Sequence, residues 1–308
     1  MDEVVASVPA MPETLRTEVE DGVGSIVLTR ADEYNTITPA LRNELAAAID
    51  QHDADNNVRV ILLRAEGPAF CAGYGLDWST AAQASAERAG AKRVWDSVAD
   101  YRMISWFVDV YMKLWYASKP TIAAVQGWCI AGGTDMVLCS DLIVAGESAV
   151  FGYPPARVWG TPTTAMWVYR MGLEQAKRYL LTGDEIPAPE AARIGLILEA
   201  VPDGELDARS TALAERMAAG ADESTPDAQA AMQSHGREYG VGNVAAGRFA
   251  VRRNRTAHAG RPRFRRTSAS GRIPAGSARA RRSIRRLWLR ASVEESSDEE
   301  NREEENLI

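Results

Sequence analysis

The sequence predicts an α/β fold in which buried strands alternate with helices. Short apolar runs bounded by turn residues alternate with longer segments whose apolar residues recur at helical spacing. Two glycine-bearing segments, 70–74 and 130–135, each follow such an apolar run. Glycine lets the backbone approach another group closely, so two loops of this kind can aim backbone N–H groups at one oxygen atom. The predictions of fold and of site therefore depend on the same two segments.

The first elements are two strands, a helix and a third strand. Residues 14–29 are two apolar stretches around an Asp-Gly dipeptide at 21–22, which is typical of a compact hairpin turn. Thr38 and Pro39 predict a helix start, with threonine as the N-cap and proline at the first helical position. The run 58–64 predicts a buried strand that leads into the first glycine segment.

A long helix is predicted over 83–117, where aromatic residues recur. Such a stripe belongs to the core, to a subunit interface or to the wall of a binding site. Strand 121–126 then leads into the second glycine segment and a helix that runs through Cys139. The remaining predicted elements are strands at 141–145, 149–152 and 197–201, and helices at 162–171, 174–182, 188–194 and 205–219, with Gly183 and Gly195 as helix ends.

Charge divides the chain into regions. The net charge is −7 over 308 residues, yet residues 248–290 hold fifteen arginines and no Asp or Glu, and 291–308 are acidic. The Arg-rich part has too few large apolar residues to offset the entropy of ordering. We therefore predict an N-terminal extension at 1–13, a core at 14–204, a C-terminal helical region at 205–247 and a disordered tail at 248–308, with one helix near 278–290.

The Arg-rich segment has two further interpretations. Binding to nucleic acid or to an acidic membrane ranks last, because few aromatic residues lie between the arginines and because the segment follows a core whose sequence is typical of an enzyme. Alternatively, residues beyond about 235 translate a shifted reading frame, since G/C-rich codons favour Arg, Ala, Gly and Pro. An uninterrupted frame with the same tail in related strains would contradict that explanation.

The sequence lacks the motifs of several common classes of enzyme. None of the three histidines lies near either glycine segment, and no nucleophile elbow, zinc-protease helix or phosphate-binding loop occurs. The three cysteines show no C-x-x-C spacing, so we predict no metal site and a reducing compartment, hence a cytoplasmic protein without a membrane span or signal peptide. Cys71, inside the first segment, is interpreted as a packed residue rather than a nucleophile.

The sequence resembles the crotonase, or enoyl-CoA hydratase/isomerase, superfamily over about residues 14–218. The landmarks are Asn35 and the segments 28–30, 69–73, 119–127, 131–133, 139–141, 151–152 and 191–196. The resemblance implies a core of repeated ββα units arranged as a spiral, followed by a C-terminal helical region. It also implies an acyl-CoA substrate with no separate cofactor, because coenzyme A is part of the substrate, and a homotrimer or hexamer.

The resemblance also assigns binding roles. The N–H groups of Tyr74 and Gly132 would form an oxyanion hole for the thioester carbonyl and so stabilise an enolate. Coenzyme A would lie along the first glycine segment, with its adenine end near the backbone of 69–72. Its predicted contacts are Arg30, Ala69, Phe70 and Ala72.

The acid–base residues depart from the pattern of typical hydratases, which carry two glutamates. Asp135 occupies the first position, and Tyr-Pro-Pro at 153–155 replaces the Gln-Pro-Glu that contains the second. Since paired carboxylates divide general acid and base work, Asp135 remains as the single acid/base, with Tyr153 as proton donor or positioning hydroxyl. Structural alternatives stay open: Asp135 can complement a helix dipole, and Tyr153 can cap a polar group.

Together these features predict an acyl-CoA-processing enzyme of the enoyl-CoA hydratase/isomerase type, a lyase or isomerase of fatty acid metabolism. The alternatives are another crotonase reaction, such as decarboxylation of a malonyl-type CoA or thioester hydrolysis, and a non-catalytic acyl-CoA-binding protein.

Overall fold

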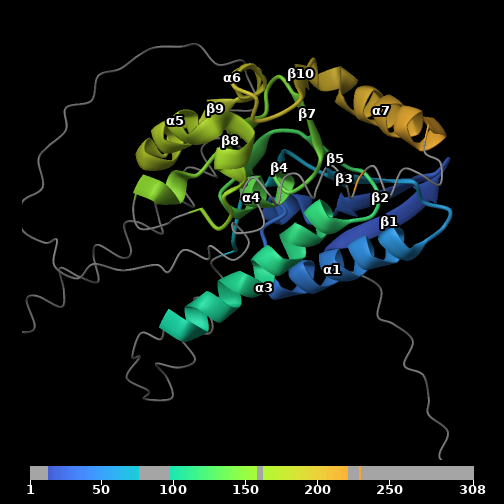
Figure 1. Cartoon of the computed structure of the whole chain (residues 1–308), viewed down its shortest axis with the longest axis horizontal. Coiled ribbons are helices and arrows are strands. Elements are labelled where there is room, and N and C mark those ends of the chain that lie inside the picture. The colour runs from blue at the N-terminus through green and yellow to red at the C-terminus, as the bar shows by residue number, and fades with distance from the viewer. Residues whose placement is uncertain (1–12, 76–96, 158–161, 221–228, 230–308) are drawn as a thin grey trace, which may run out of the picture. The chain divides into compact units, whose positions relative to one another are not determined.

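The computed structural model describes residues 13–75, 97–157, 162–220 and Gln229, and within them the strands form two mixed sheets (Figure 1). The six-stranded sheet has the order β1 (Leu15–Glu20), β2 (Val23–Leu28), β3 (Val60–Ala65), β5 (Thr121–Val125), β7 (Leu142–Gly146) and β10 (Glu199–Val201). The four-stranded sheet has the order β4 (Ala69–Cys71), β6 (Trp128–Ile130), β8 (Val150–Gly152) and β9 (Ile186–Pro187). Only the β1–β2 and β8–β9 pairs are antiparallel.

The chain repeatedly leaves a strand of the large sheet and enters a strand of the small one. It does so from β3 to β4, from β5 to β6 and from β7 to β8. The helices that follow these pairs in the sequence are α3 (Ser97–Tyr116), α4 (Gly132–Val137) and α5 (Met166–Thr182). This succession is the predicted repeat of ββα units, and it places the ends of β4 and β6 side by side.

Alternate residues along the large sheet face two different cores. In β3, Val60 and Leu62 pack with α7 (Leu206–Gly220), whereas Ile61 and Leu63 belong to the larger core with α1 (Pro39–Ala54). Figure 1 shows α7 on one side of the sheet and α1 with α3 on the other. The larger core also contains the small sheet, so the two sheets are held together by buried apolar side chains.

Most predicted elements are confirmed to within a few residues. Thr38 caps α1, its Oγ1 accepting a bond of 3.2 Å from the Leu41 N–H, and Pro39 is the first helical residue. The Asp-Gly turn joins β1 to β2, with φ of 47° at Asp21 and 79° at Gly22. Helix α6 (Ala188–Arg193) also lies where the sequence predicted it.

One expectation needs correction, one is confirmed in detail, and others fall outside the described residues. The glycine segments predicted as loops at 70–74 and 130–135 begin inside short strands, since 69–71 and 128–130 each pair with a neighbour in the small sheet. The helices expected at 162–171 and 174–182 correspond to α5, which consists of two helical segments interrupted at Gly172, where φ is 77° and ψ is 165°, so the predicted break is confirmed. Residues 83–96 of the long predicted helix, the N-terminal extension and the tail lie outside the described residues. The predicted domain bounds remain predictions.

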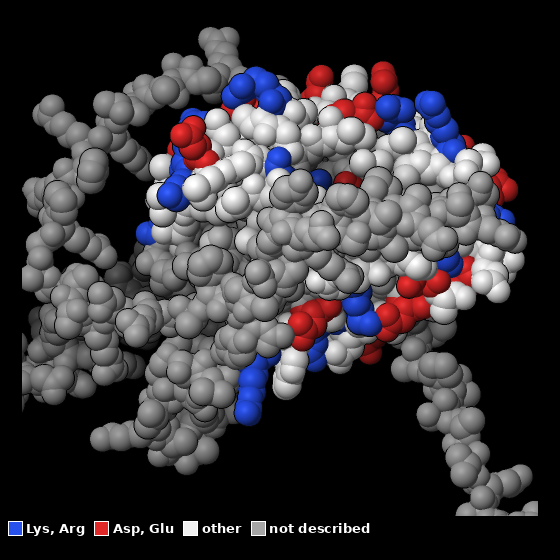
Figure 2. Space-filling view, viewed as in Figure 1, with Lys and Arg blue, Asp and Glu red and all other residues white. Residues whose placement is uncertain are grey.

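Charged side chains of both signs lie close together on the described surface. Figure 2 shows acidic and basic groups interspersed on one face. Ion pairs join Lys113 to Asp50, Arg193 to Glu190 and Arg209 to Glu199. Within the described part of the chain, no helix is long and apolar enough to cross a membrane.

Candidate active site

The two glycine segments lie against each other at the ends of β4 and β6. These strands are parallel, with Cys71 paired to Cys129. At Gly73, where φ is +88°, a Cβ would stand 2.9 Å from the Cβ of Ala131 and 3.7 Å from the backbone nitrogen of Gly132. Only glycine allows this approach, because it has no Cβ and tolerates the positive φ. The fold therefore brings the two predicted oxyanion segments together.

The backbone N–H groups of Tyr74 and Gly132 are unengaged by backbone acceptors in the described residues. A short parallel bridge explains this at Tyr74: the Ile37 N–H donates to the Gly73 carbonyl at 2.8 Å, and the Gly75 N–H to the Ile37 carbonyl at 3.0 Å. The two hydrogen bonds of the bridge use groups of Gly73 and Gly75, and neither uses the Tyr74 N–H. Buried N–H groups usually have an acceptor, so two neighbouring ones without a backbone partner suit an oxygen atom of a ligand.

Asp135 lies in α4 with its side chain completely buried. Its Oδ2 accepts bonds from the Thr163 N–H at 2.8 Å and the Thr163 hydroxyl at 2.5 Å, and its Oδ1 accepts one from the Trp167 indole N–H at 2.6 Å. Burial raises the pKa of Asp135 to about 6, and the bonds from Thr163 and Trp167 lower it in part. The carboxyl group can therefore exchange a proton near neutral pH.

Phenolic hydroxyls surround the carboxyl group. The Tyr111 hydroxyl donates to the Tyr74 hydroxyl over a long 3.4 Å, and Thr163 lies near enough to the Tyr74 hydroxyl to lower its pKa in part. Tyr153 is buried, and its ring meets that of Trp167 edge to face at 6.4 Å. Burial raises the pKa of all three phenols, and the charge of Asp135 adds to this, so they stay protonated at neutral pH.

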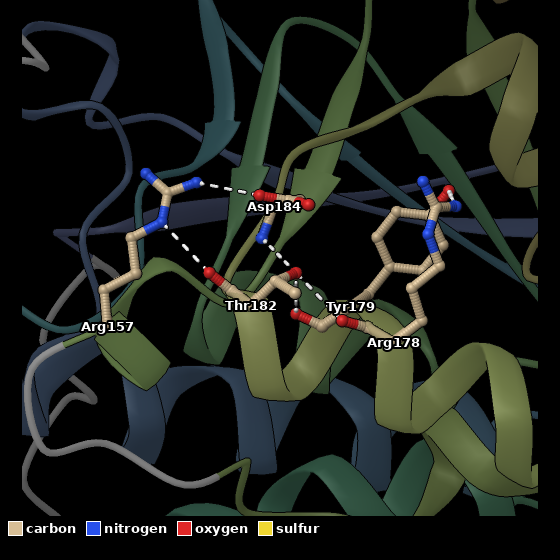
Figure 3. Close-up of polar contacts among 5 residues, drawn as sticks. All are labelled: Arg157, Arg178, Tyr179, Thr182 and Asp184. Atoms are coloured by element: carbon tan, nitrogen blue, oxygen red, sulfur yellow. Dashed lines mark hydrogen bonds and ion pairs between the residues drawn. The ribbon is translucent and has the colours of Figure 1, made fainter. Parts of the chain in front are cut away.

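The segment that lacks the second glutamate turns its arginine away from Asp135. Residues Pro154–Arg157 form a short 3₁₀ helix. The Arg157 Nε donates to the Thr182 carbonyl at 3.3 Å, and its guanidinium pairs with Asp184 at 3.6 Å, as Figure 3 shows. Among the described residues, no second carboxylate interacts with Asp135. The part of the site that the structure describes thus contains one acid–base carboxyl group rather than two.

The predicted coenzyme A contacts lie along one stretch of backbone. Ala69 and Phe70 are fully buried and Ala72 is half-buried. The Ala69 carbonyl accepts a bond from the Asn35 side chain, and the N–H groups of Phe70 and Ala72 donate to the carbonyls of Gln126 and Tyr34. Because these groups are already bonded within the protein, other atoms would have to contact the ligand.

Arg30 begins the turn that leads to this stretch. Its guanidinium bonds Glu33 and, at 3.4 Å, the Thr36 carbonyl, while its own carbonyl accepts a bond from the Asn35 N–H. The side chain therefore stabilises the turn in this structure. The coenzyme A assignments of Arg30, Ala69, Phe70 and Ala72 stay predictions.

The cysteines near the site are all buried and free of disulfides. Burial raises the pKa of the Cys71 thiol to about 12, so the nucleophilic thiolate is disfavoured at neutral pH. This agrees with the interpretation of Cys71 as a packed residue.

Sequence reasoning missed Thr163, Trp167 and Tyr111 as parts of the site. Thr163 and Thr164 precede an apolar helical pattern, a signal that points to a helix start but not to a partner. Tyr111 was included only in the aromatic stripe of the long helix. In the structure Tyr111, Phe107 and Trp115 of that stripe are core residues, whereas Trp106 is exposed.

Two sheets joined strand by strand, with two glycine segments in contact beside a buried carboxyl group, define an α/β protein of the crotonase fold. The enoyl-CoA hydratase/isomerase family model matches residues 18–247, so the chain belongs to this family. The predictions of family and fold are confirmed.

Several relatives are similar over much of the chain. A probable enoyl-CoA hydratase of Rhodobacter capsulatus is 30% identical over 210 residues, which cover 67% of this chain and 76% of the relative. A hydroxycinnamoyl-CoA hydratase-lyase of Pseudomonas fluorescens is 28% identical over 199 residues, covering 63% and 68%. The crystal structure of an enoyl-CoA hydratase from Mycobacterium smegmatis matches with a TM-score of 0.70 and 37% identity, covering 76% of this chain and 81% of that one.

Proposed function

We propose that this protein converts acyl-CoA thioesters through an enolate, most simply by adding water to an enoyl-CoA. The observation that supports the proposal is the close approach of Gly73 to Ala131 and Gly132, which brings together the segments that carry the N–H groups of Tyr74 and Gly132, next to the helix that holds Asp135. Two N–H donors can stabilise the negative charge that develops on the thioester oxygen.

In this proposal Asp135 performs both proton transfers in turn. It takes a proton from water as the oxygen bonds to the β-carbon, and the double-bond electrons move to the thioester oxygen. It then returns the proton to the α-carbon as the enolate collapses. A pKa raised by burial to about 6 suits both steps, because the group is a usable acid and a usable base near neutral pH.

A non-catalytic acyl-CoA-binding protein is the second candidate. Both oxygens of Asp135 already accept hydrogen bonds, so the side chain also serves to anchor the start of α5. Among the described residues, no second carboxylate interacts with Asp135. This favours the same alternative, or a crotonase reaction that needs only enolate stabilisation, such as decarboxylation or thioester hydrolysis.

Product analysis by mass spectrometry separates these functions. The protein is incubated with crotonyl-CoA, a long-chain enoyl-CoA, a hydroxycinnamoyl-CoA and methylmalonyl-CoA, and each binding constant is measured by calorimetry. A hydrated product that is lost in Asp135→Asn supports the proposal. Loss of carbon dioxide from methylmalonyl-CoA, release of free coenzyme A, or binding without turnover each identifies one alternative and contradicts hydration.

Coenzyme A binding along 69–72 is part of the same proposal. If Arg30 contacts the phosphates, Arg30→Gln raises KM for every thioester without lowering kcat, because the group lies far from the reacting carbons. Equal KM values in both proteins would remove Arg30 from the site.

Assembly as a trimer or hexamer is proposed from the family alone, and sedimentation velocity tests it.

A further inference from the structure

The carboxyl group of Asp135 has almost all of its acceptor positions filled. An ionised carboxylate offers about four lone-pair positions, two on each oxygen. The N–H and the hydroxyl of Thr163 fill both positions on Oδ2, and the Trp167 indole N–H fills one on Oδ1. Within the described part of the chain, one acceptor position, on Oδ1, has no donor.

Thr163 lies just before α5 and Trp167 in its first turn, and a second set of hydrogen bonds joins α5 to the residues that follow α4. Arg170, about one turn after Trp167, donates to the Leu138 carbonyl at 2.8 Å and to the Ser140 carbonyl, at the C-terminal end of α4. Two separate sets of hydrogen bonds therefore join these parts of the chain: one at Asp135, in α4 itself, and one at this pair of carbonyls. The attachment fixes the direction in which the carboxyl group points.

We propose that Thr163 and Trp167 are positioning residues. Thr163 fills both acceptor positions on Oδ2 and Trp167 fills one on Oδ1, so the remaining position on Oδ1 exchanges a proton with the substrate. The inference rests on the function proposed above. According to this proposal, one oxygen atom, Oδ1, both accepts the proton and later returns it to the α-carbon. Thr163 and Trp167 determine the direction in which that atom points.

The other ionisable groups near Asp135 do not compete for this role. Those that couple to it electrostatically come from the segments packed around it: Tyr74 after β4, Tyr111 in α3, Cys129 in β6, Cys139 after α4 and Tyr153 after β8. Burial raises the pKa of each of them, so all stay neutral near pH 7. On α5 the neighbouring charged side chain is Arg170, which bonds backbone carbonyls.

Two substitutions remove one bond each. Thr163→Val deletes the hydroxyl but keeps the backbone N–H, and Trp167→Phe deletes the indole N–H. Thr164→Val and Trp115→Phe are matched controls, because the buried Thr164 hydroxyl and the buried Trp115 N–H have no hydrogen-bond partner in the described part of the chain. The Trp115 ring packs against Tyr169 of α5, so its replacement also tests general disturbance of that helix.

The first readout needs no activity. The protein is labelled with ¹³C at the aspartate carboxyl groups, and the Asp135 signal is identified by its loss in Asp135→Asn. We expect the titration midpoint of Asp135 to rise by about one pH unit in Thr163→Val and in Trp167→Phe, since a hydrogen bond to a charged group favours the ionised form. The two control variants should titrate like the wild type.

The second readout is the pH dependence of kcat/KM with the thioester that the product analysis identifies. The pKa of its acidic limb should rise by the same amount in both test variants. Trp167→Phe should in addition lower kcat at every pH, because Oδ1 is no longer held in one orientation. Wild-type midpoints in both test variants would overturn the positioning role. Shifted midpoints in a protein that converts no thioester would instead refute the proposed function and the proton transfer that rests on it.

Discussion

The ring of Tyr74 lies directly against the Cα of Gly132. A Cβ at Gly132 would stand 2.7 Å from Cε2 of Tyr74 and 2.8 Å from Cδ1 of Ile37. The Tyr74 ring and Gly132 belong to the two segments whose backbone N–H groups form the candidate oxyanion hole. The contact fixes the spacing of the two donors, and it explains why the second segment needs glycine at this position.

Gly132→Ala should therefore disturb the site more than the fold. Alanine keeps the backbone N–H, but the clash displaces it from the thioester oxygen, so we expect kcat/KM to fall by up to about 100-fold, the effect of losing an oxyanion donor. Stability should fall by about 1–3 kcal/mol from overpacking. Because the clash is partly with the Tyr74 ring, adding Tyr74→Ala should recover part of the lost stability, as measured by urea denaturation of all four proteins in the cycle. Simple additivity of the two substitutions would show that the contact is not tight.

Gly127 and Gly172 form a matched pair for backbone strain. Both have positive φ, +56° and +77°, but a Cβ at Gly127 would stand 2.0 Å from the Pro68 carbonyl oxygen, whereas at Gly172 nothing lies within 4 Å. We expect Gly172→Ala to cost about 1–2 kcal/mol from the backbone conformation alone, since φ of 77° with ψ of 165° is adopted almost only by glycine. Gly127→Ala should cost about 3 kcal/mol or more, because a backbone atom obstructs the methyl group. Equal losses in thermal or urea unfolding would contradict this difference.

Asp135 should make stability fall as pH rises through its folded pKa. The pKa is about 6 in the folded protein against an ordinary value of 3.8, so the folded state holds the proton more tightly. The associated stabilisation is fully present below pH 3.8 and is lost as pH rises through about 6, in total about 3 kcal/mol. We expect the free energy of unfolding of the wild type to fall by this order, relative to Asp135→Asn, between pH 4 and pH 7. A constant difference across that range would mean that Asp135 titrates normally.

His52 should act in the opposite direction. It is completely buried with its Nε2 at 3.2 Å from the Ser25 carbonyl, and burial lowers its pKa below the ordinary 6.5. Its contribution is present above pH 6.5 and is lost as pH falls toward the lowered pKa, because the unfolded chain then takes up the proton more readily. Relative to His52→Gln, the wild type should lose stability on acidification below pH 6.5. The reverse trend would indicate that His52 is protonated in the folded protein.

The order of strands and helices could be predicted from the sequence because its signals are local. Apolar runs such as 58–64, the cap formed by Thr38 and Pro39, and the Asp-Gly turn at 21–22 each involve neighbouring residues, and each has its expected place in the structure. The shorter strands β4 and β6 were missed, since three residues are too few to show a period, and their pairing partners lie far away in the chain.

By itself, the sequence determined the fold class, the family, and two glycine segments with an aspartate beside the second. Only the tertiary structure decided how that aspartate is held. Thr163 and Trp167 follow Asp135 by 28 and 32 residues, and a bond between side chains so far apart leaves no periodic trace in the chain. Packing α5 against α4 brings them together, and the burial that results raises the pKa of the carboxyl group to about 6.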